Sequence, residues 1–239
     1  MPRFFTDTPP EKEAVITGED AYHIGRSLRM KPGEKLTLCC AGTDYVCEIT
    51  RVYAESVSVR VLSSGDCEAE PALFLTLYQA LPKSEKMDFI VQKAVELGVG
   101  RIVPVFTARC VSRPDEKSMR HKIERWQKIA LSAAKQSGRG NIPQIEGAVT
   151  FGECIEAASA DEAAFFCYEA GGKSIADVSF EGISSASVIV GPEGGFEPEE
   201  AALAESSCIT ITSLGKRILR CETAPLAAIT AIMLRSGNL

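Results

Sequence analysis

The sequence predicts an α/β protein in which a domain built on a parallel sheet follows a small β-rich domain. Two observations support this prediction. Up to about residue 62 the apolar residues fall in short β-type runs separated by turn signals, whereas later apolar strands alternate with amphipathic helical stretches. Strands that alternate with helices form a mostly parallel sheet covered by helices. The chain has 239 residues, enough for two domains of ordinary size.

The first domain is predicted to contain three β-strands and one short helix. The strands "KLTLCC", "YVCEITRVY" and "SVSVRVL" lie at residues 35–40, 45–53 and 56–62. The helix lies at residues 19–30, before the turn signal "KPGE". Residues 63–71 are polar, contain Gly and Pro, have no apolar period, and therefore predict a hinge. We expect domains at residues 1–66 and 72–239.

The second domain alternates strands and helices along its length. Apolar or β-branched runs predict strands at residues 73–81, 101–106, 163–168, 187–191 and 208–214. Helical spacing of apolar residues, or an acidic start after proline, predicts helices at residues 86–99, 119–139, from 198 onward, and 222–236. The last helix is apolar around much of its circumference, as expected of a helix buried in the core or in a homodimer.

Composition excludes several classes of protein. Hydrophobic residues make up 45% and charged residues 24%, which is typical of a globular protein with a real core. No apolar run approaches the roughly 18 residues of a membrane span, so we expect no membrane association and a cytoplasmic location. Nine scattered cysteines without C-x-x-C, and only two histidines, predict reduced thiols and no metal site. The net charge of −6 argues against a generic nucleic-acid binder but is compatible with a local basic patch.

A Gly-rich turn after a predicted strand is the first candidate site. "VIVGPEGGF" places Gly191, Gly194 and Gly195 around Glu193. The spacing fits neither a P-loop nor a dinucleotide-binding turn, and a carboxylate would repel a phosphate. The turn suits a ligand that is neutral or positive near Glu193, such as a sulfonium or an ammonium group. Alternatively, the glycines only form a tight turn and Glu193 is solvated.

The second candidate site is the loop before the last helix, "SLGKRILRCETAPLAAI". It combines Gly215 and three cations, Lys216, Arg217 and Arg220, with the carboxylate of Glu222. Charges next to a buried helix are costly unless they meet a partner, which favours a functional loop. The alternative is a capped helix start with solvated arginines.

Together these motifs resemble a known family. "QALPKSEKMDFIVQKAVELGV", "QSGR", "GPEGGF" and "LGKRILRCETAPLAAI", with the N-terminal "PRFF" and "HIGRSLRMKPGE", are similar to the 16S rRNA uracil-N3 methyltransferases, the ribosomal RNA small subunit methyltransferase E family. The resemblance implies a PUA-like β-barrel followed by a SPOUT-type parallel sheet with a trefoil knot, acting as a homodimer. It implies S-adenosylmethionine as cofactor, which is cationic and would tolerate Glu193. The implied substrate is N3 of a uridine in the decoding region of 16S rRNA in the small ribosomal subunit.

The resemblance also implies roles for individual residues. The cofactor is expected to contact Tyr168, Glu169, Gly191, Glu193, Gly194, Gly195, Leu214, Gly215, Ile218, Leu219, Thr223 and Ala224. Because N3 must lose its proton, the base must be unpaired or flipped out. We expect Arg220 to stabilise charge on the uracil, and Glu222 or Glu193 either to accept the proton or only to orient the cofactor. RNA is expected to contact Arg3, Phe4, Arg26, Arg29, Lys83, Lys86, Arg139 and Arg217. The chain departs from the family pattern at Lys135, where an acidic residue is usual.

Two other functions remain open from the sequence. One is a PUA-like RNA-binding ribosome assembly factor without catalysis, and the other is a SPOUT methyltransferase that acts on tRNA. The intact "GPEGG" and "ETA" segments disfavour the first, because a pure binder needs no cofactor pocket. The basic N-terminal residues do not distinguish rRNA from tRNA.

Overall fold

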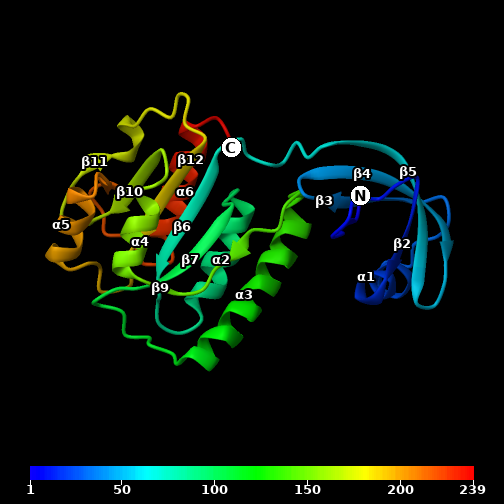
Figure 1. Ribbon diagram of the computed structural model, residues 1–239, viewed down its shortest axis with the longest axis horizontal. Helices are drawn as coiled ribbons and strands as arrows, with labels where there is room; N and C mark the ends of the chain where they lie inside the picture. The colour runs from blue at the N-terminus through cyan, green and yellow to red at the C-terminus, as the bar shows by residue number, and fades with distance from the viewer. The chain divides into compact units, whose positions relative to one another are not determined.

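The computed structural model describes residues 1–239, apart from the side chain of Ala176. The chain divides into two compact units, seen in Figure 1. The first comprises Met1–Glu70 and Ala134–Asn141, and the second comprises Pro71–Ala133 and Ile142–Leu239. Residues 134–141, which the sequence places in the second domain, thus group with the first unit.

The first unit is a five-stranded sheet with the strand order β1-β3-β4-β5-β2. Its strands are β1 (Arg3–Phe5), β2 (Glu13–Thr17), β3 (Lys35–Cys40), β4 (Thr43–Val52) and β5 (Ser56–Asp66). Only the β1–β3 pair is parallel. Two register shifts between β4 and β5 bend the sheet, as β-bulges do, and the sheet curls as expected for a small PUA-like β domain. The sequence did not predict β1 or β2.

A short helical segment packs on this sheet and closes the first core. It consists of α1 (Gly18–Tyr22) and the π-helical turn η1 (His23–Ser27). Its buried residues Ala21 and Ile24 pack against apolar side chains of β3, β4 and β5. Strand β5 continues to Asp66 because residues 63–66 pair with the start of β4, so half of the predicted hinge is strand.

The second unit is built on an eight-stranded sheet in which every pair is parallel. The strand order is β11-β13-β10-β12-β6-β7-β8, with β9 also paired to β7. The strands are β6 (Phe74–Ala80), β7 (Arg101–Phe106), β8 (Gln144–Ile145), β9 (Val149–Thr150), β10 (Ala163–Cys167), β11 (Lys173–Ser174), β12 (Ser185–Val190) and β13 (Thr210–Ser213). The helices are α2 (Lys86–Glu96), α3 (Glu116–Ser137), α4 (Phe151–Ala158), the short η2 (Ile175–Asp177), α5 (Pro198–Ser206) and α6 (Ala224–Arg235).

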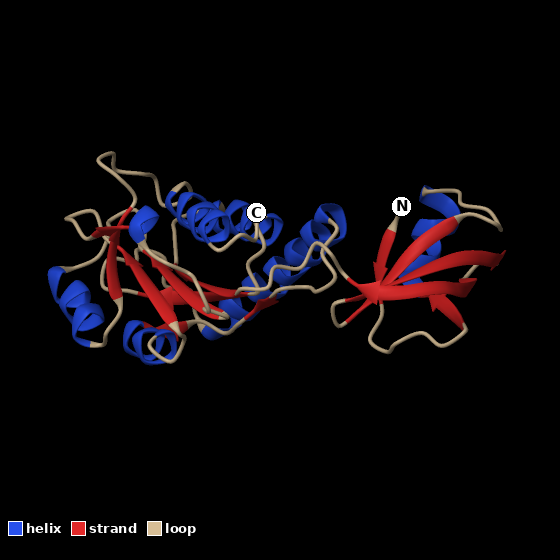
Figure 2. Cartoon of the chain, turned by 90° about the horizontal axis from the view of Figure 1, so that it is seen from above, coloured by secondary structure: helices blue, strands red, loops and turns tan.

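Helices cover both faces of this sheet, as Figure 2 shows. Helices α4 and α5 pack on a core that includes Phe166 and Ile189. Helix α6 contacts α2 and the central strand β12, although β13 precedes it in the chain. The chain therefore returns from β13 toward the middle of the sheet before α6 begins. The predicted fold class is confirmed. No helix among the described residues is long and apolar enough to cross a membrane.

Candidate active site

A cavity of about 540 Å³ lies where three neighbouring strands end. Strands β13, β10 and β12 are adjacent in the sheet, and because they are parallel their carboxyl ends meet at one edge. Such edges are where α/β proteins bind ligands. The cavity is formed by the loops that follow these strands, which carry the cofactor contacts implied by the family resemblance.

Most of the predicted cofactor-binding residues line this cavity. Those that do are Tyr168, Glu169, Gly191, Glu193, Gly194, Gly195, Leu214, Gly215, Ile218, Leu219 and Ala224. Arg217 and Arg220 also line it, whereas Thr223 and Glu222 do not. Thr223 is exposed, and its side chain does not cap α6. Pro192, Phe196, Lys216 and Cys221 also line the cavity and lie within the loops expected from the family resemblance, whereas the lining residues Cys167, Val190 and Ser213 were not predicted.

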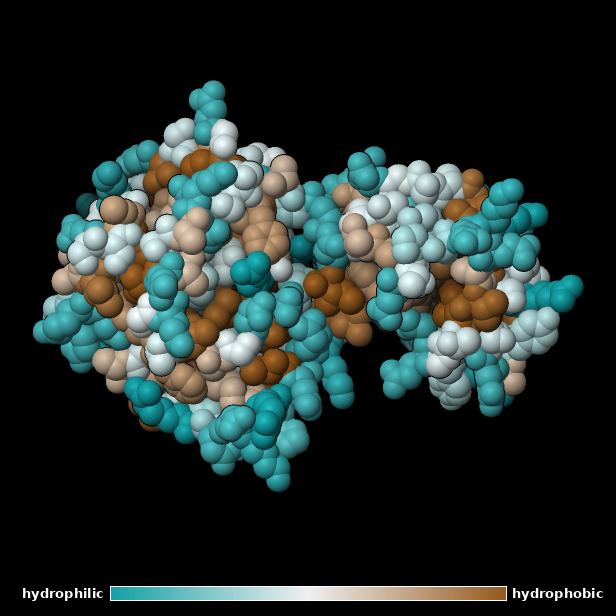
Figure 3. Space-filling view, in the orientation of Figure 1, coloured by the Kyte–Doolittle hydropathy of each residue, from teal (hydrophilic) through white to brown (hydrophobic). Residues whose placement is uncertain are grey.

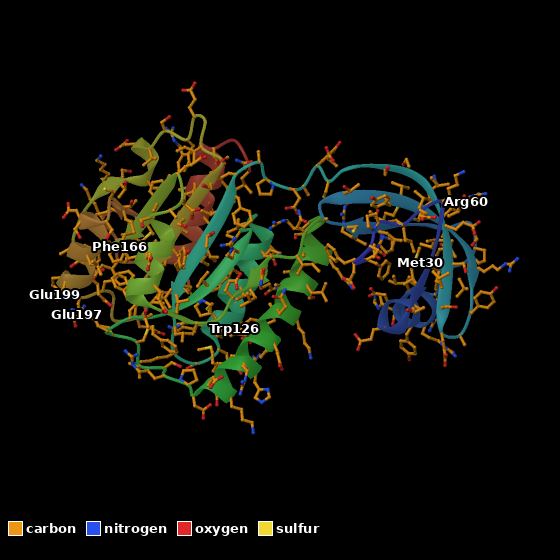
Figure 4. The ribbon with its side chains drawn as sticks, in the orientation of Figure 1. Met30, Arg60, Trp126, Phe166, Glu197 and Glu199 are labelled. Atoms are coloured by element: carbon orange, nitrogen blue, oxygen red, sulfur yellow. The ribbon has the colours of Figure 1, made fainter. Side chains whose placement is uncertain are left out.

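The glycine loop, residues 191–197, needs its glycines because other side chains approach it closely. Gly195 has φ +67°, and a Cβ there would lie 2.5 Å from Oε1 of Glu169. A Cβ on Gly194 would lie 3.2 Å from Cβ of Arg109. At the end of the loop, Phe196 is buried with its ring centroid 4.2 Å from that of Phe166, a core residue labelled in Figure 4. The loop is therefore fixed by the core and has no room for larger residues.

Arg109 is a neighbour of the glycine loop that the sequence did not predict. It follows β7, and its guanidinium donates to the carbonyl of Gly194 and to Oε2 of Glu197, each at 2.8 Å. The hydrogen bond to Glu197 outweighs the opposing effect of burial, so the pKa of Arg109 is raised. The signal in the sequence was a cation at the carboxyl end of another strand of the same parallel sheet. This cation positions the loop.

Glu193 is already paired with a cation of the protein. Its Oε1 lies 3.0 Å from Nζ of Lys86 and accepts the backbone N–H of Lys83 at 3.1 Å. Lys86 Nζ also lies 3.2 Å from Oε2 of Glu222, which in turn lies 3.2 Å from Sγ of Cys221. We call Lys86, Glu193, Glu222 and Cys221 the Lys86 cluster. The sequence predicted a ligand that is neutral or positive near Glu193; the structure adds that Lys86 of the protein itself pairs with this carboxylate.

These contacts shift the pKa values of the cluster. Burial works to raise the pKa of Glu193, but the ammonium of Lys86 and the N–H of Lys83 outweigh it, so the pKa is lowered. The Cys221 thiol, more than Lys86, lowers the pKa of Glu222. Burial and the nearby Glu222 raise the pKa of Cys221 to about 12, so the thiol stays protonated at neutral pH. Glu222 is thus a stabilised carboxylate and a weak proton acceptor.

The loop at residues 214–221, which we call the cation loop, carries three cations that, unlike Lys86, are unpaired in the described part of the chain. Lys216, Arg217 and Arg220 line the cavity and are exposed. None of these side chains forms a hydrogen bond or an ion pair with another residue that the structure describes. They are therefore available to a bound anion or to a polar group in the cavity.

Comparisons with known proteins agree with this geometry. Residues 69–233 match the family model of an RNA methyltransferase domain, and residues 16–62 match that of an RNA methyltransferase PUA domain. Over 227 residues the chain is 35% identical to ribosomal RNA small subunit methyltransferase E of Bacillus subtilis (strain 168), covering 91% of this chain and 88% of that protein. The chain belongs to the ribosomal RNA small subunit methyltransferase E family.

Solved structures of similar proteins extend this result to the fold. The methyltransferase E of Neisseria gonorrhoeae, described as bound to S-adenosyl methionine, has a TM-score of 0.89 and 30% identity, covering 98% of this chain and 97% of that chain. A methyltransferase from Legionella pneumophila, described as a complex with the cofactor SAM, has a TM-score of 0.85 and 32% identity, covering 97% of this chain and 96% of that chain.

Three of the RNA contacts predicted for this methyltransferase E family member are side chains that the structure shows buried or paired within the first unit. Phe4 is 2% exposed and belongs to the core of the first unit, so it cannot stack on a base. Arg3 donates from both Nη atoms to Asp44, at 2.5 and 2.8 Å. Arg139 is 3% exposed and donates from Nε to Glu70 at 2.8 Å. These side chains build the first unit.

The other predicted RNA contacts divide into paired and unpaired residues. Lys86 is committed to its cluster, whereas Arg26, Arg29 and Lys83 are exposed, and no side-chain partner occurs for them among the described residues. Lys135, the departure from the family pattern, lies 2.8 Å from Asp20 and stabilises the first unit. No group of three or more His, Cys, Asp or Glu residues in the described part of the chain is arranged to hold a metal ion.

Proposed function

We propose that the chain methylates N3 of a uridine in the decoding region of 16S rRNA, with S-adenosylmethionine as the methyl donor. The observation that carries this proposal is the cavity at the ends of β13, β10 and β12, rimmed on one side by the glycine loop and on another by three unpaired cations. Its volume of about 540 Å³ lies within the roughly 300–1,000 Å³ usual for a small-molecule site. Family membership supports rRNA rather than tRNA as the substrate.

The residues present fit such a cofactor. Gly191, Gly194 and Gly195 allow close approach of a ligand to backbone, and Leu214 and Leu219 supply apolar contacts on the opposite loop. The pairing of Glu193 with Lys86 leaves the glycine loop without a bare carboxylate. When bound, the cofactor supplies a methyl group activated by its sulfonium.

Arg220 is the residue that we assign to the transition state. A uracil that loses its N3 proton carries negative charge on its carbonyl oxygens, and an oriented guanidinium can donate to two acceptors. Arg220 is exposed at the cavity and has no partner among the described side chains that would hold it elsewhere. Arg217 and Lys216, on the same loop, are then suited to phosphate. Glu222, predicted as a proton acceptor, does not line the cavity and its pKa is lowered, so we assign it to the Lys86 cluster.

The remaining proposed partners are RNA and a second copy of the chain. Arg26, Arg29 and Lys83 would contact the RNA backbone of the small ribosomal subunit in the cytoplasm. A homodimer, implied by the family resemblance, would account for apolar side chains exposed on the second unit: Phe89, Ile218 and Leu234. Figure 3 shows exposed apolar residues among hydrophilic ones on the face in view. Light scattering at micromolar concentration tests the dimer, and a monomer alone would exclude it.

Mapping methylated nucleotides tests the proposed function. Mass spectrometry of 16S rRNA from a strain without this protein should show the loss of one N3-methyluridine, restored by the wild-type protein. Gly194→Val should not restore it, because its side chain meets Arg109, whereas Gly147→Val should, because a Cβ at Gly147 meets nothing within 4 Å. An unchanged 16S rRNA, or a methyl group lost from tRNA instead, would overturn the proposal.

A further inference from the structure

We propose that Lys86 is a positioning residue that couples the two loops of the cofactor cavity. The inference rests on the proposed function in one respect: S-adenosylmethionine is the ligand of the cavity. Lys86 was predicted to contact RNA, but its ammonium lies 3.0 Å from Glu193 of the glycine loop and 3.2 Å from Glu222, directly after the cation loop. One side chain thus joins two loops that follow different strands.

Lys86 is attached to a rigid part of the fold. It is the first residue of α2, whose next turns are buried through Met87 and Ile90. The same end of α2 is held by Asp88, which accepts a hydrogen bond from Nε1 of Trp126 at 3.0 Å. Because α2 is fixed by its buried face, the ammonium of Lys86 holds the carboxylates of Glu193 and Glu222 at a defined position.

The charge balance makes Lys86 necessary for this arrangement. Glu193 and Glu222 both lie within 3.2 Å of the same ammonium, so without Lys86 two carboxylates would face each other. Two carboxylates drawn to one point repel each other once the cation is removed. Glu193 belongs to the glycine loop and Glu222 directly follows the cation loop, so the repulsion acts on both loops. Hydrogen bonds that involve charged groups are the stronger ones in proteins. The loss of Lys86 should therefore displace both loops together.

The chain offers a closely matched control on the same helix. Lys93 of α2 also pairs with a carboxylate, Glu96, at 2.8 Å, and its side chain is 35% exposed, compared with 32% for Lys86. Its partner lies on α2 itself, so the pair joins no loops. Lys93→Met removes the same charge and a similar ion pair without touching the cavity.

Hydrogen exchange of the ligand-free protein tests the coupling directly. In Lys86→Met, exchange should accelerate about tenfold or more in residues 191–197 and 214–223 together, because loss of a charged hydrogen bond shifts a local opening equilibrium by at least that factor. The amides of Gly195 and Thr223, which donate to carbonyls in their own loops, report each loop. Lys93→Met should exchange like wild type, and Lys86→Arg should retain most protection. Acceleration in one loop only, or in neither, would overturn the proposal.

Calorimetric titration with S-adenosylmethionine supplies a second readout. Lys86→Met should weaken binding by about tenfold or more, with Lys93→Met within about twofold of wild type. Glu222→Gln should weaken binding in the wild-type background but cause little further loss in Lys86→Met, because the two residues act as one unit. Independent, additive losses would contradict the coupling. If wild type binds the cofactor but does not methylate rRNA, the proposed function fails while the coupling stands, and the exchange experiment decides the coupling even without cofactor binding.

Discussion

The first unit and the cation loop use basic residues in opposite ways. In the first unit, Arg139 is buried and Arg3 is half-buried, and each meets a carboxylate through two hydrogen bonds. In the cation loop, Lys216, Arg217 and Arg220 lie within five residues, are exposed, and have no partner among the described side chains. Both groups look alike in the sequence, as cations within recognised motifs. The difference teaches that a cation is evidence for an RNA contact only when the fold leaves it unpaired.

The strongest test of this comparison removes the partner of a buried arginine. Glu70 accepts two hydrogen bonds from Arg139 and the amides of Gly140 and Asn141. Glu70→Gln should lower the free energy of unfolding by about 3–5 kcal/mol, because it removes the carboxylate charge that faces the buried Arg139 guanidinium. Urea denaturation at neutral pH measures this. Glu48→Gln, which breaks a more exposed pair with Arg60, should cost less than about 1 kcal/mol and serves as the control.

The stability that Glu70 and Arg139 contribute to the fold should depend on pH in a definite direction. Burial alone would raise the pKa of Glu70, but Arg139 and the backbone amides outweigh it and lower the pKa below its ordinary value of 4.5. A carboxylate with a depressed folded pKa stabilises the fold above its unfolded pKa, and this stability is lost as pH falls through the folded value. The wild type should therefore lose stability below about pH 4.5 more steeply than Glu70→Gln. If the free energy of unfolding of wild type and Glu70→Gln fell equally with pH, Glu70 would not be the group that causes the loss of stability in acid.

The next test changes an unpaired cation at the cavity. Arg220→Lys keeps the charge but loses the planar guanidinium, and should slow methyl transfer by about 10²–10³. The dissociation constant of S-adenosylmethionine should change much less, since the interaction is strongest in the transition state. Higher pH should restore part of the rate, because the uracil then loses N3–H more readily. Single-turnover methylation of small subunits across pH measures this, and a near-normal rate would make Arg220 a phosphate or structural residue.

A smaller effect is expected for the unpaired cations of the first unit. Replacing Arg26 and Arg29 by Glu should weaken RNA binding and reduce the slope of log K against log salt by about 0.9 for each duplex phosphate that the protein no longer neutralises. Arg60→Glu is the matched control, because Arg60 is exposed in the same unit but paired with Glu48. Filter binding across salt concentrations measures the slope. Equal effects of all three substitutions would contradict the distinction between paired and unpaired cations.

The smallest effect is expected for a half-exposed pair. Lys135→Met removes the ion pair with Asp20 and a cation–π interaction 5.5 Å from the ring of Phe4. Partly exposed ion pairs contribute little, so the free energy of unfolding should fall by less than about 1 kcal/mol. Thermal denaturation measures the change. A decrease as large as that of Glu70→Gln would mean that burial does not determine how much an ion pair contributes to the free energy of unfolding.

The features that follow local rules could be predicted from the sequence. Apolar periodicity located the main strands and helices, and glycine-containing turns after predicted strands indicated two of the cavity loops. The third, at Tyr168 and Glu169, was implied only by the family resemblance. Strands β1 and β2 were missed because three and five residues carry too little alternation. Helix α4 was missed although its capping box, Thr150 with Glu153, is visible in the sequence.

The state of each charged side chain could not be predicted, because it depends on partners distant in the chain. Lys86 and Glu222 are 136 residues apart, and Arg139 and Glu70 are 69 residues apart. No periodicity or motif encodes such a pairing in a single sequence. The resemblance to a family supplied positions for the site but not which carboxylate neutralises which cation. That part of the site required the fold.

The grouping of residues 134–141 with the first unit decides whether this unit can be separated from the rest of the chain. A fragment that ends at Glu70 would lack Arg139 and the amides of Gly140 and Asn141, and would leave the Glu70 carboxylate without its donors. It would also lack Lys135, the partner of Asp20. The segment that supplies these groups begins in α3, whose first part belongs to the second unit. The first unit is therefore not a detachable N-terminal cassette: recombination or gene fusion must carry both parts of the chain together.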